Sequence, residues 1–275
     1  MADQLTAVDT GTRTWFKPLL MATLVTSAFG NIAGLTLASS VYGQETTALA
    51  DAALAQDAGT LGVCMATMLV MMRTHHSGFR ELVGLGVAGF LAYNAVIYCF
   101  DITFGPLFLV WTMVLGLSVF TLASGFRLLV TGGLSADVHR TVFAPGVMMT
   151  VATLFSLLWL GEIVIDLLVG DGSTSAAAWR VPTNPVHVLD LAVALPAAFV
   201  TGVAMLQRRP LGVLATPAVL TFLIMMSIPI VLTPVSSTLQ AHPAAWASVP
   251  PVLAIAVLCS VALWRSLPQD PNGPS

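Results

Sequence analysis

Long apolar runs, separated by short polar segments, make up most of this chain. A helix that crosses the hydrocarbon core of a bilayer needs about 20 mostly apolar residues. Eight runs suited to that role lie at 18–42, 57–73, 80–101, 105–129, 143–169, 185–207, 210–233 and 247–266. Backbone groups cannot remain unpaired in lipid, and the alternation typical of barrel strands is absent, so each run is predicted to be helical. We therefore expect an all-α, polytopic transmembrane bundle with about eight spans.

The composition supports a surface that faces lipid. Hydrophobic residues make up 57% of the 275 residues, charged residues make up 8%, and the mean hydropathy is +0.90. A soluble domain carries about 25% charged residues because it faces water on all sides. The lipid bilayer is therefore the predicted partner, and the small net charge of -3 argues against nucleic acid. The three cysteines lie far apart inside apolar runs, which predicts neither a disulfide framework nor a zinc site.

Basic residues set the expected orientation. In an eight-span layout, nine of the ten Lys and Arg residues fall on one side, and only Arg180 falls on the other. Basic segments stay in the cytoplasm, so both the N-terminus and the C-terminus are predicted to be cytoplasmic. The expected organisation is a cytoplasmic segment at 1–17, a transmembrane domain at 18–266 and a polar, disordered tail at 267–275. The expected location is the cell inner (plasma) membrane.

Acidic side chains gather in the outer half of the predicted bundle. Five of them lie at or within helix ends: Asp57, Asp101, Glu162, Asp166 and Asp190. Ionisable groups at membrane depth cost several kcal/mol, so they normally face a bundle interior or a watery cavity. Glu162 and Asp166 are four residues apart, which places them on one helical face.

The segment from Pro182 to Asp190 has the pattern of a helix start. Asn184 suits the N-cap position, and Pro185 suits the first helical position, where a missing N–H has no cost. His187 and Asp190 then share a face within the first two turns. The positive end of the helix favours an ionised Asp190 and disfavours a protonated His187, whereas the proximity of the two residues opposes the second tendency. The sequence leaves this balance open.

These polar residues have two interpretations. They either form an outward-facing intramembrane pocket, or they cap helices and hydrogen-bond separately at the headgroup level. Under the first interpretation, the candidate catalytic residues are His187, Asp190, Glu162, Asp166 and Asp57. The candidate substrate-pocket residues are Asn184, Tyr93, Asn94, Tyr98, Asp101 and Gln56. Neither a metal nor another cofactor is predicted, because a second outer histidine, His242, falls in a different loop.

Two phrases of the sequence resemble a known family. They are Tyr93–Phe100, which continues through Phe104–Leu109 to Leu117–Ser118, and Pro182–Leu191. Together with Gln56–Asp57 and Trp159–Leu160, they resemble an uncharacterised family of bacterial multipass membrane proteins, from the second span through the seventh. Members of that family often have His and Asn where this chain has Thr103 and Gly105. The resemblance implies an eight-span-like bundle in a bacterial inner membrane, and it implies no activity.

The leading hypothesis from the sequence is a membrane-embedded enzyme that acts on a lipid-like small molecule at the outer leaflet. A desolvated carboxyl group could serve as a general acid beside an ionised neighbour that serves as a base. The alternatives are a transporter or proton-coupled carrier and a non-catalytic membrane subunit or sensor. A carrier needs polar residues through the whole membrane depth, whereas the inner halves of the predicted spans are nearly all apolar. Pro196 is expected to kink the sixth span.

Overall fold

The computed structural model describes residues 2–72, 78–131, 133 and 138–267. Within these residues the chain is helical without strands, and eight helices are long and apolar enough to cross a membrane. The predicted all-α polytopic bundle is therefore confirmed. The basic residues Arg73, His75 and His76 and the predicted tail from Pro268 to Ser275 lie outside the described residues.

Seven of the spans are formed by single helices, and one is interrupted. The uninterrupted spans belong to α1 (Ala2–Thr36), α3 (Thr47–Met72), α4 (Gly78–Asp101), α5 (Phe108–Thr131), α6 (Phe143–Val169), α10 (Pro210–Leu239) and α11 (Val249–Arg265). The sixth span consists of α8 (Pro185–Leu189), a π-helical turn (Asp190–Ala194) and α9 (Leu195–Leu206). The shorter elements are α2 (Ala38–Val41), α7 (Thr174–Trp179) and a 3-10 turn (Trp246–Ser248).

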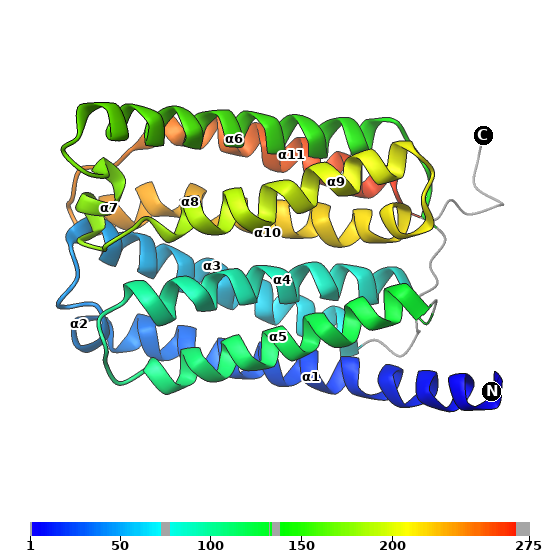
Figure 1. Ribbon diagram of the computed structural model, residues 1–275. Helices are drawn as coiled ribbons and strands as arrows, with labels where there is room; N and C mark the ends of the chain where they lie inside the picture. The colour runs from blue at the N-terminus through cyan, green and yellow to red at the C-terminus, as the bar shows by residue number, and fades with distance from the viewer. Residues whose placement is uncertain (1, 73–77, 132, 134–137, 268–275) are drawn as a thin grey trace.

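The spans pack as two groups that α10 joins. Helices α1, α3, α4 and α5 pack against one another, and α6 packs against α9 and α11. Helix α10 contacts α3 and α4 on one side and α9 and α11 on the other, as Figure 1 shows. Fully buried side chains such as Phe90 and Leu220 fill the interior of the bundle. This arrangement leaves the outer ends of α6, α8 and α11 facing those of α3 and α4.

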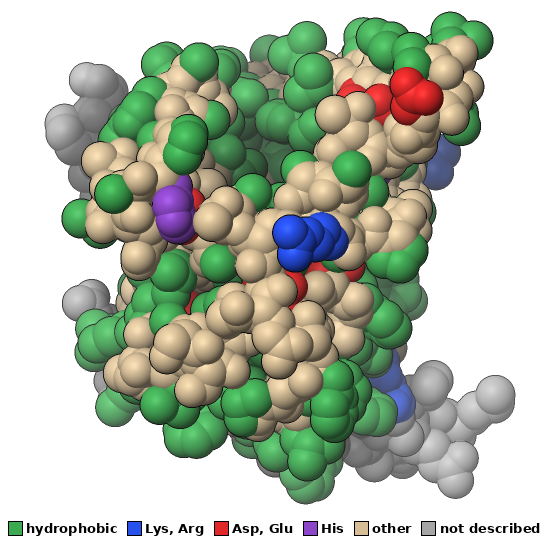
Figure 2. All heavy atoms as spheres, turned by 90° about the vertical axis from the view of Figure 1, so that its left-hand side faces the viewer, with side chains coloured by type: hydrophobic (Ala, Val, Ile, Leu, Met, Phe, Trp, Pro, Cys, Tyr) green, Lys and Arg blue, Asp and Glu red, His purple; other side chains and the backbone are tan. Residues whose placement is uncertain are grey.

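The elements divide clearly between the two ends of the bundle. Helix α1 begins and α11 ends at the same end, on the right of Figure 1, whereas α2 and α7 lie at the opposite end. The distribution of basic residues along the sequence predicts that the first end lies in the cytoplasm. We call the opposite end the outer face, and Figure 2 shows that this face is hollowed.

The second span begins earlier than the sequence indicated. Helix α3 starts at Thr47, ten residues before the apolar run at 57–73, and α1 ends at Thr36. The polar pair Gln56 and Asp57 looked like the edge of a span, but both residues lie inside α3. Polar side chains can lie that deep when they find partners within the bundle.

The sixth span contains a widened turn before Pro196. Proline has no N–H to donate to the carbonyl four residues earlier. In the turn before it, the N–H of Leu195 donates to the carbonyl of Asp190, five residues back, which is the π-helical spacing. Such single π-turns often occur at functional sites, and this one begins three residues after His187.

Candidate functional site

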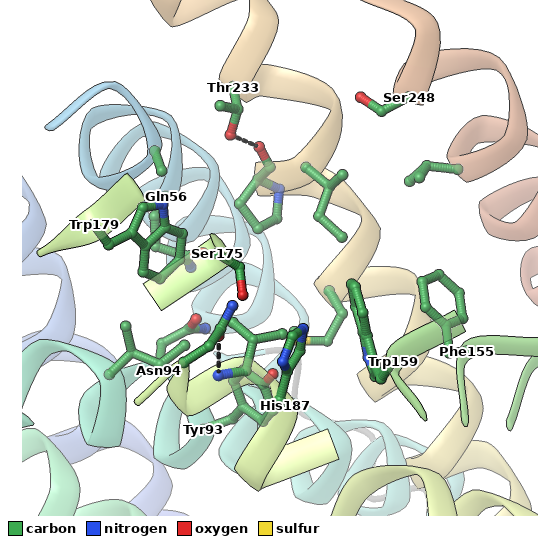
Figure 3. A pocket seen from close by; sticks show the side chains of 18 of the residues that line it. Gln56, Tyr93, Asn94, Phe155, Trp159, Ser175, Trp179, His187, Thr233 and Ser248 are labelled. Atoms are coloured by element: carbon green, nitrogen blue, oxygen red, sulfur yellow. Dashed lines mark hydrogen bonds between the residues drawn. The ribbon is translucent and has the colours of Figure 1, made fainter. Parts of the chain in front are cut away.

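A cavity of about 730 Å³ lies in the outer half of the bundle. Residues from α3, α4, α6, α7, α8, α10 and α11 line it, so both groups of helices contribute. One part of its wall is apolar: Leu154, Phe155, Leu158, Ile230, Val252 and Ile255. The other part carries polar side chains and aromatic rings, several of which Figure 3 shows: Gln56, Tyr93, Asn94, Trp159, Trp179 and His187. A cavity with this division suits an amphiphilic molecule.

Glu162 and His187 form a pair at the cavity wall. Helix α6 supplies Glu162 and α8 supplies His187, and Oε2 of Glu162 lies 3.8 Å from Nε2 of His187. The side chain of His187 is buried, whereas that of Glu162 is 33% exposed. The distance is too long for a hydrogen bond, so both groups remain able to bond a ligand. Carboxylate and imidazole groups are the usual acids and bases of proton transfer.

Asp190 lies behind this pair and holds two neighbouring side chains by hydrogen bonds. Its Oδ1 accepts a hydrogen bond from the Tyr93 hydroxyl at 3.0 Å, and its Oδ2 accepts one from Trp159 Nε1 at 2.8 Å. The Trp159 ring lies against the His187 ring, with 4.7 Å between their centroids. Asp190 is buried and does not line the cavity. Its carboxylate therefore fixes the indole against which the imidazole packs.

The start of α8 follows the expected capping pattern. The Asn184 side chain accepts a hydrogen bond from the Val186 N–H at 2.9 Å, and Pro185 occupies the first helical position. This confirms the predicted helix start. Because the cap fixes the first turn, it also holds His187 in the wall of the cavity.

Asp57 lies outside the cavity, in a buried cluster with two tyrosines. Its two carboxylate oxygens accept hydrogen bonds from the Tyr42 hydroxyl at 2.6 Å and the Tyr98 hydroxyl at 2.9 Å. Asp57 is fully buried, and Gly34 of α1 packs directly against it. Burial, reinforced by the Asp57 carboxylate, raises the pKa of Tyr42 far above its ordinary value, so its hydroxyl keeps its proton. We call Asp57, Tyr42 and Tyr98 the tyrosine clamp, which ties α3 to α4 and to the segment after α2.

Asp166 lies one turn from Glu162, but it borders a second cavity. Its carboxylate accepts hydrogen bonds from the backbone N–H and the hydroxyl of Thr174, at 3.0 and 2.7 Å. This second cavity, of about 650 Å³, lies between the outer end of α6 and α8. Asn184 and His187 border both cavities. Asp166 thus anchors α7 to α6, lies outside the main cavity and shares the wall of the second cavity with His187.

The remaining candidates divide between the cavity and its surroundings. Gln56 and Asn94 line the cavity and are held by hydrogen bonds, to the Thr60 hydroxyl at 2.7 Å and to the Phe90 carbonyl at 2.8 Å. Tyr98 lines the cavity while donating to the tyrosine clamp. Asp101, at the end of α4, lies outside the cavity.

Sequence reasoning missed several residues of the cavity wall: Ser175, Trp179, Thr233 and Ser248. Trp179 belongs to α7, a short helix in an outer loop, and no periodic pattern pointed to it. Trp159 was noted only as part of a family resemblance. It lies three residues before Glu162 on α6, so helical spacing alone could have placed both on one face.

Among the described residues, no group of three or more His, Cys, Asp and Glu side chains is arranged to hold a metal ion. Neither a family model, nor a curated protein, nor a solved structure matches this chain. The arguments for function therefore come from the cavity itself.

Proposed function

We propose that this membrane protein takes a lipid-like, amphiphilic molecule into the outer cavity and acts on it as an enzyme. Glu162 and His187 would be its acid–base pair. The observation that carries the proposal is their placement, 3.8 Å apart, in the wall of a cavity of about 730 Å³ that is otherwise largely apolar. A catalytic acid or base must reach the proton that it transfers, and both side chains border the space that a ligand would fill.

Two buried carboxylates, Asp57 and Asp190, are poor candidates for proton transfer. Both oxygens of Asp57 accept hydrogen bonds from tyrosine hydroxyls, and those of Asp190 accept them from Tyr93 and Trp159. A carboxylate that holds other side chains through both oxygens cannot take up a proton without weakening those bonds. Glu162 and His187 are not held by such hydrogen bonds among the described residues. We therefore assign proton transfer to this pair.

The second cavity offers a route for a ligand from the membrane. It lies between α6 and α8, beside side chains that are exposed on the lipid-facing surface, such as Leu167 and Val188. His187 and Asn184 form part of the wall between this cavity and the main one. A lipid-like substrate would enter sideways from the outer leaflet and meet His187 first.

The interior below the cavity favours an enzyme over a carrier. Asn94 lines the cavity, and one turn further inward Phe90 is fully buried in the apolar core with Leu91 and Leu220. A proton-coupled carrier needs ionisable or strongly polar groups across the membrane depth. Among the described residues, the apolar layer of Phe90, Leu91 and Leu220 under the cavity contributes no ionisable side chain to such a relay.

The family resemblance and the location are part of the same proposal. The phrase Tyr93–Phe100 supplies Tyr93 and Asn94 to the cavity, and Pro182–Leu191 supplies Asn184 and His187. If the family retains these phrases for a site, its members share this cavity. The bacterial inner membrane is the proposed location, with the cavity open away from the cytoplasm.

The test compares lipids from cells that lack the gene and are complemented with wild type, Glu162→Gln, His187→Gln or Asp171→Asn. Untargeted mass spectrometry of the extracts should show a lipid-like species that wild type converts and that accumulates with the first two variants. Asp171→Asn is the matched control, because it removes an exposed acidic group just after α6 that lines neither cavity. An unchanged lipid profile, together with altered uptake of a small solute, would overturn the enzyme in favour of a carrier. A partner protein lost from the two variants, with unchanged lipids, would indicate a subunit.

A further inference from the structure

We propose that the ligand carries a positively charged head, an amine or a quaternary ammonium group, which binds beside Glu162 between Trp159 and Trp179. This inference rests on the proposed function and names its substrate class. The structural basis is an acidic side chain that shares a cavity with two indole rings, and the described lining of this cavity contains neither lysine nor arginine.

The charge of the cavity wall is one-sided. Among the described lining residues, Glu162 is the only Asp, Glu, Lys or Arg. A phosphate, sulfate or carboxylate head would find no lysine or arginine in this lining and would be repelled by Glu162, and a buried charge without a strong partner is costly. A cationic head would instead gain a direct partner in the carboxylate of Glu162.

The Glu162 carboxylate has capacity for such a partner. Apart from the approach of His187 at 3.8 Å, the described residues engage it in no hydrogen bond or ion pair. Its side chain is 33% exposed, so the group remains hydrated when the cavity is empty. An ammonium group would displace that water and contact the Glu162 carboxylate directly. The attraction between the two opposite charges is stronger there than in water because the cavity is less polar.

Aromatic rings line the same cavity as the Glu162 carboxylate. Trp159 and Trp179 both line the cavity, and Figure 3 shows them on opposite sides of the space next to His187. Tyr93 lines it as well. Ring faces attract cations, tryptophan most strongly, and aromatic side chains are the usual means of recognising quaternary ammonium groups. The apolar wall of α6, α10 and α11 would then accommodate the hydrocarbon part.

The outer half of the bundle adds a favourable field. Among the described residues of this half, five acidic side chains are at least partly exposed, against the one arginine Arg180: Glu45, Asp101, Glu162, Asp166 and Asp171. A surface that carries more acidic than basic groups attracts cations toward its clefts. Cations are therefore enriched where the cavity opens.

The experiment measures binding of three probes that share an eight-carbon chain and differ in head charge: octyltrimethylammonium, octan-1-ol and octyl sulfate. The full-length protein in nanodiscs of digalactosyldiacylglycerol, a neutral lipid without an ammonium group, is titrated while tryptophan fluorescence is followed, and empty nanodiscs give the correction for partitioning. We expect the ammonium probe to bind about tenfold more tightly than octanol, with the sulfate weakest. Glu162→Gln should bring the ammonium and octanol affinities within about threefold of each other, whereas Asp171→Asn, which removes an exposed acidic group outside both cavities, should preserve the difference.

The outcomes separate this inference from the proposed function. Equal binding of ammonium and octanol to wild type, or tightest binding of the sulfate, overturns the cationic head while the amphiphile cavity stands. Binding of no probe above empty nanodiscs overturns both. If Glu162→Gln fails to give a monodisperse protein, Trp179→Leu decides: a selective loss of ammonium affinity supports the inference, and an equal loss for both probes overturns it.

Discussion

Asp57 and Glu162 are both carboxyl groups in the outer half of the bundle, but their surroundings differ. Asp57 is fully enclosed, and each of its oxygens accepts a hydrogen bond from a tyrosine. Glu162 is 33% exposed, borders a cavity and has only His187 nearby, at 3.8 Å. If depth of burial identified the reactive carboxyl group, Asp57 would be chosen. The absence of hydrogen bonds from other described side chains instead identifies Glu162 as the group that can bond a ligand. The comparison teaches that the hydrogen-bond partners of a buried acid decide between a structural and a chemical role.

The largest expected effect comes from Asp57→Ala. The substitution leaves the buried hydroxyls of Tyr42 and Tyr98 without their acceptor and opens a void, which should lower the free energy of unfolding by about 3 kcal/mol. The thermal unfolding midpoint of the purified protein in detergent measures it. Glu162→Ala, the counterpart in the cavity, should lower the free energy by only about 0.5 kcal/mol. Equal losses of stability would break the comparison.

Gly34→Ala tests how tightly the tyrosine clamp is packed. A Cβ at this position would overlap the Asp57 carboxylate and come within 2.7 Å of the Tyr42 hydroxyl oxygen. Overpacking of this kind should cost about 2 kcal/mol in the same unfolding assay. Gly161→Ala is the matched control on α6, next to Glu162, where a Cβ would meet nothing within 4 Å. A Gly34→Ala protein as stable as the control would show that the clamp yields easily.

Trp159→Phe tests a side chain that contacts both a buried structural carboxylate, Asp190, and a residue of the cavity, His187. The variant removes the N–H that donates to Asp190 at 2.8 Å, and it replaces the indole that packs on His187. The free energy of unfolding should fall by about 1 kcal/mol, and the affinity for octyltrimethylammonium should fall several-fold more than that for octanol. A loss of stability with unchanged probe affinities would place Trp159 with the structural residues.

Glu162→Gln should have the smallest effect on stability of these variants, but it should abolish conversion of the lipid-like species. The amide keeps the size of the side chain and removes its charge, and no hydrogen bond of the described protein depends on that charge. The unfolding midpoint should be unchanged within error, while conversion of the lipid-like species stops. Retained conversion would remove Glu162 from the chemistry.

The sequence was informative where the physics is local. The number of spans follows from the length of the apolar runs, and the cap at Asn184 follows from its position before Pro185. These features depend on residues that are neighbours along the chain. The start of α3 was misplaced because a polar pair inside a helix looks like the end of a span until its partners are known.

The roles of the acidic residues could not be predicted from the sequence, because they depend on contacts between residues far apart along the chain. Asp57 is satisfied by Tyr98, 41 residues away, and Asp190 by Tyr93, 97 residues away. Glu162 and Asp166 share a helix face, but Thr174 in the following segment takes up only Asp166. Such long-range pairings depend on how the helices pack, and helical spacing carries no information about them.

The π-turn at Asp190–Ala194 changes the rotational phase of the sixth span between its outer end and its inner end. An α-helix turns about 100° per residue, so one residue more or less rotates everything beyond it by that angle. A wide turn holds such an extra residue and thereby offsets the outer end of the span against its inner end. Deleting a single residue within it would let the inner end keep its contacts with α6 and α10 while the imidazole swings away from its carboxylate. The widened turn is therefore a place where a one-residue length change could disable the site without unfolding the protein.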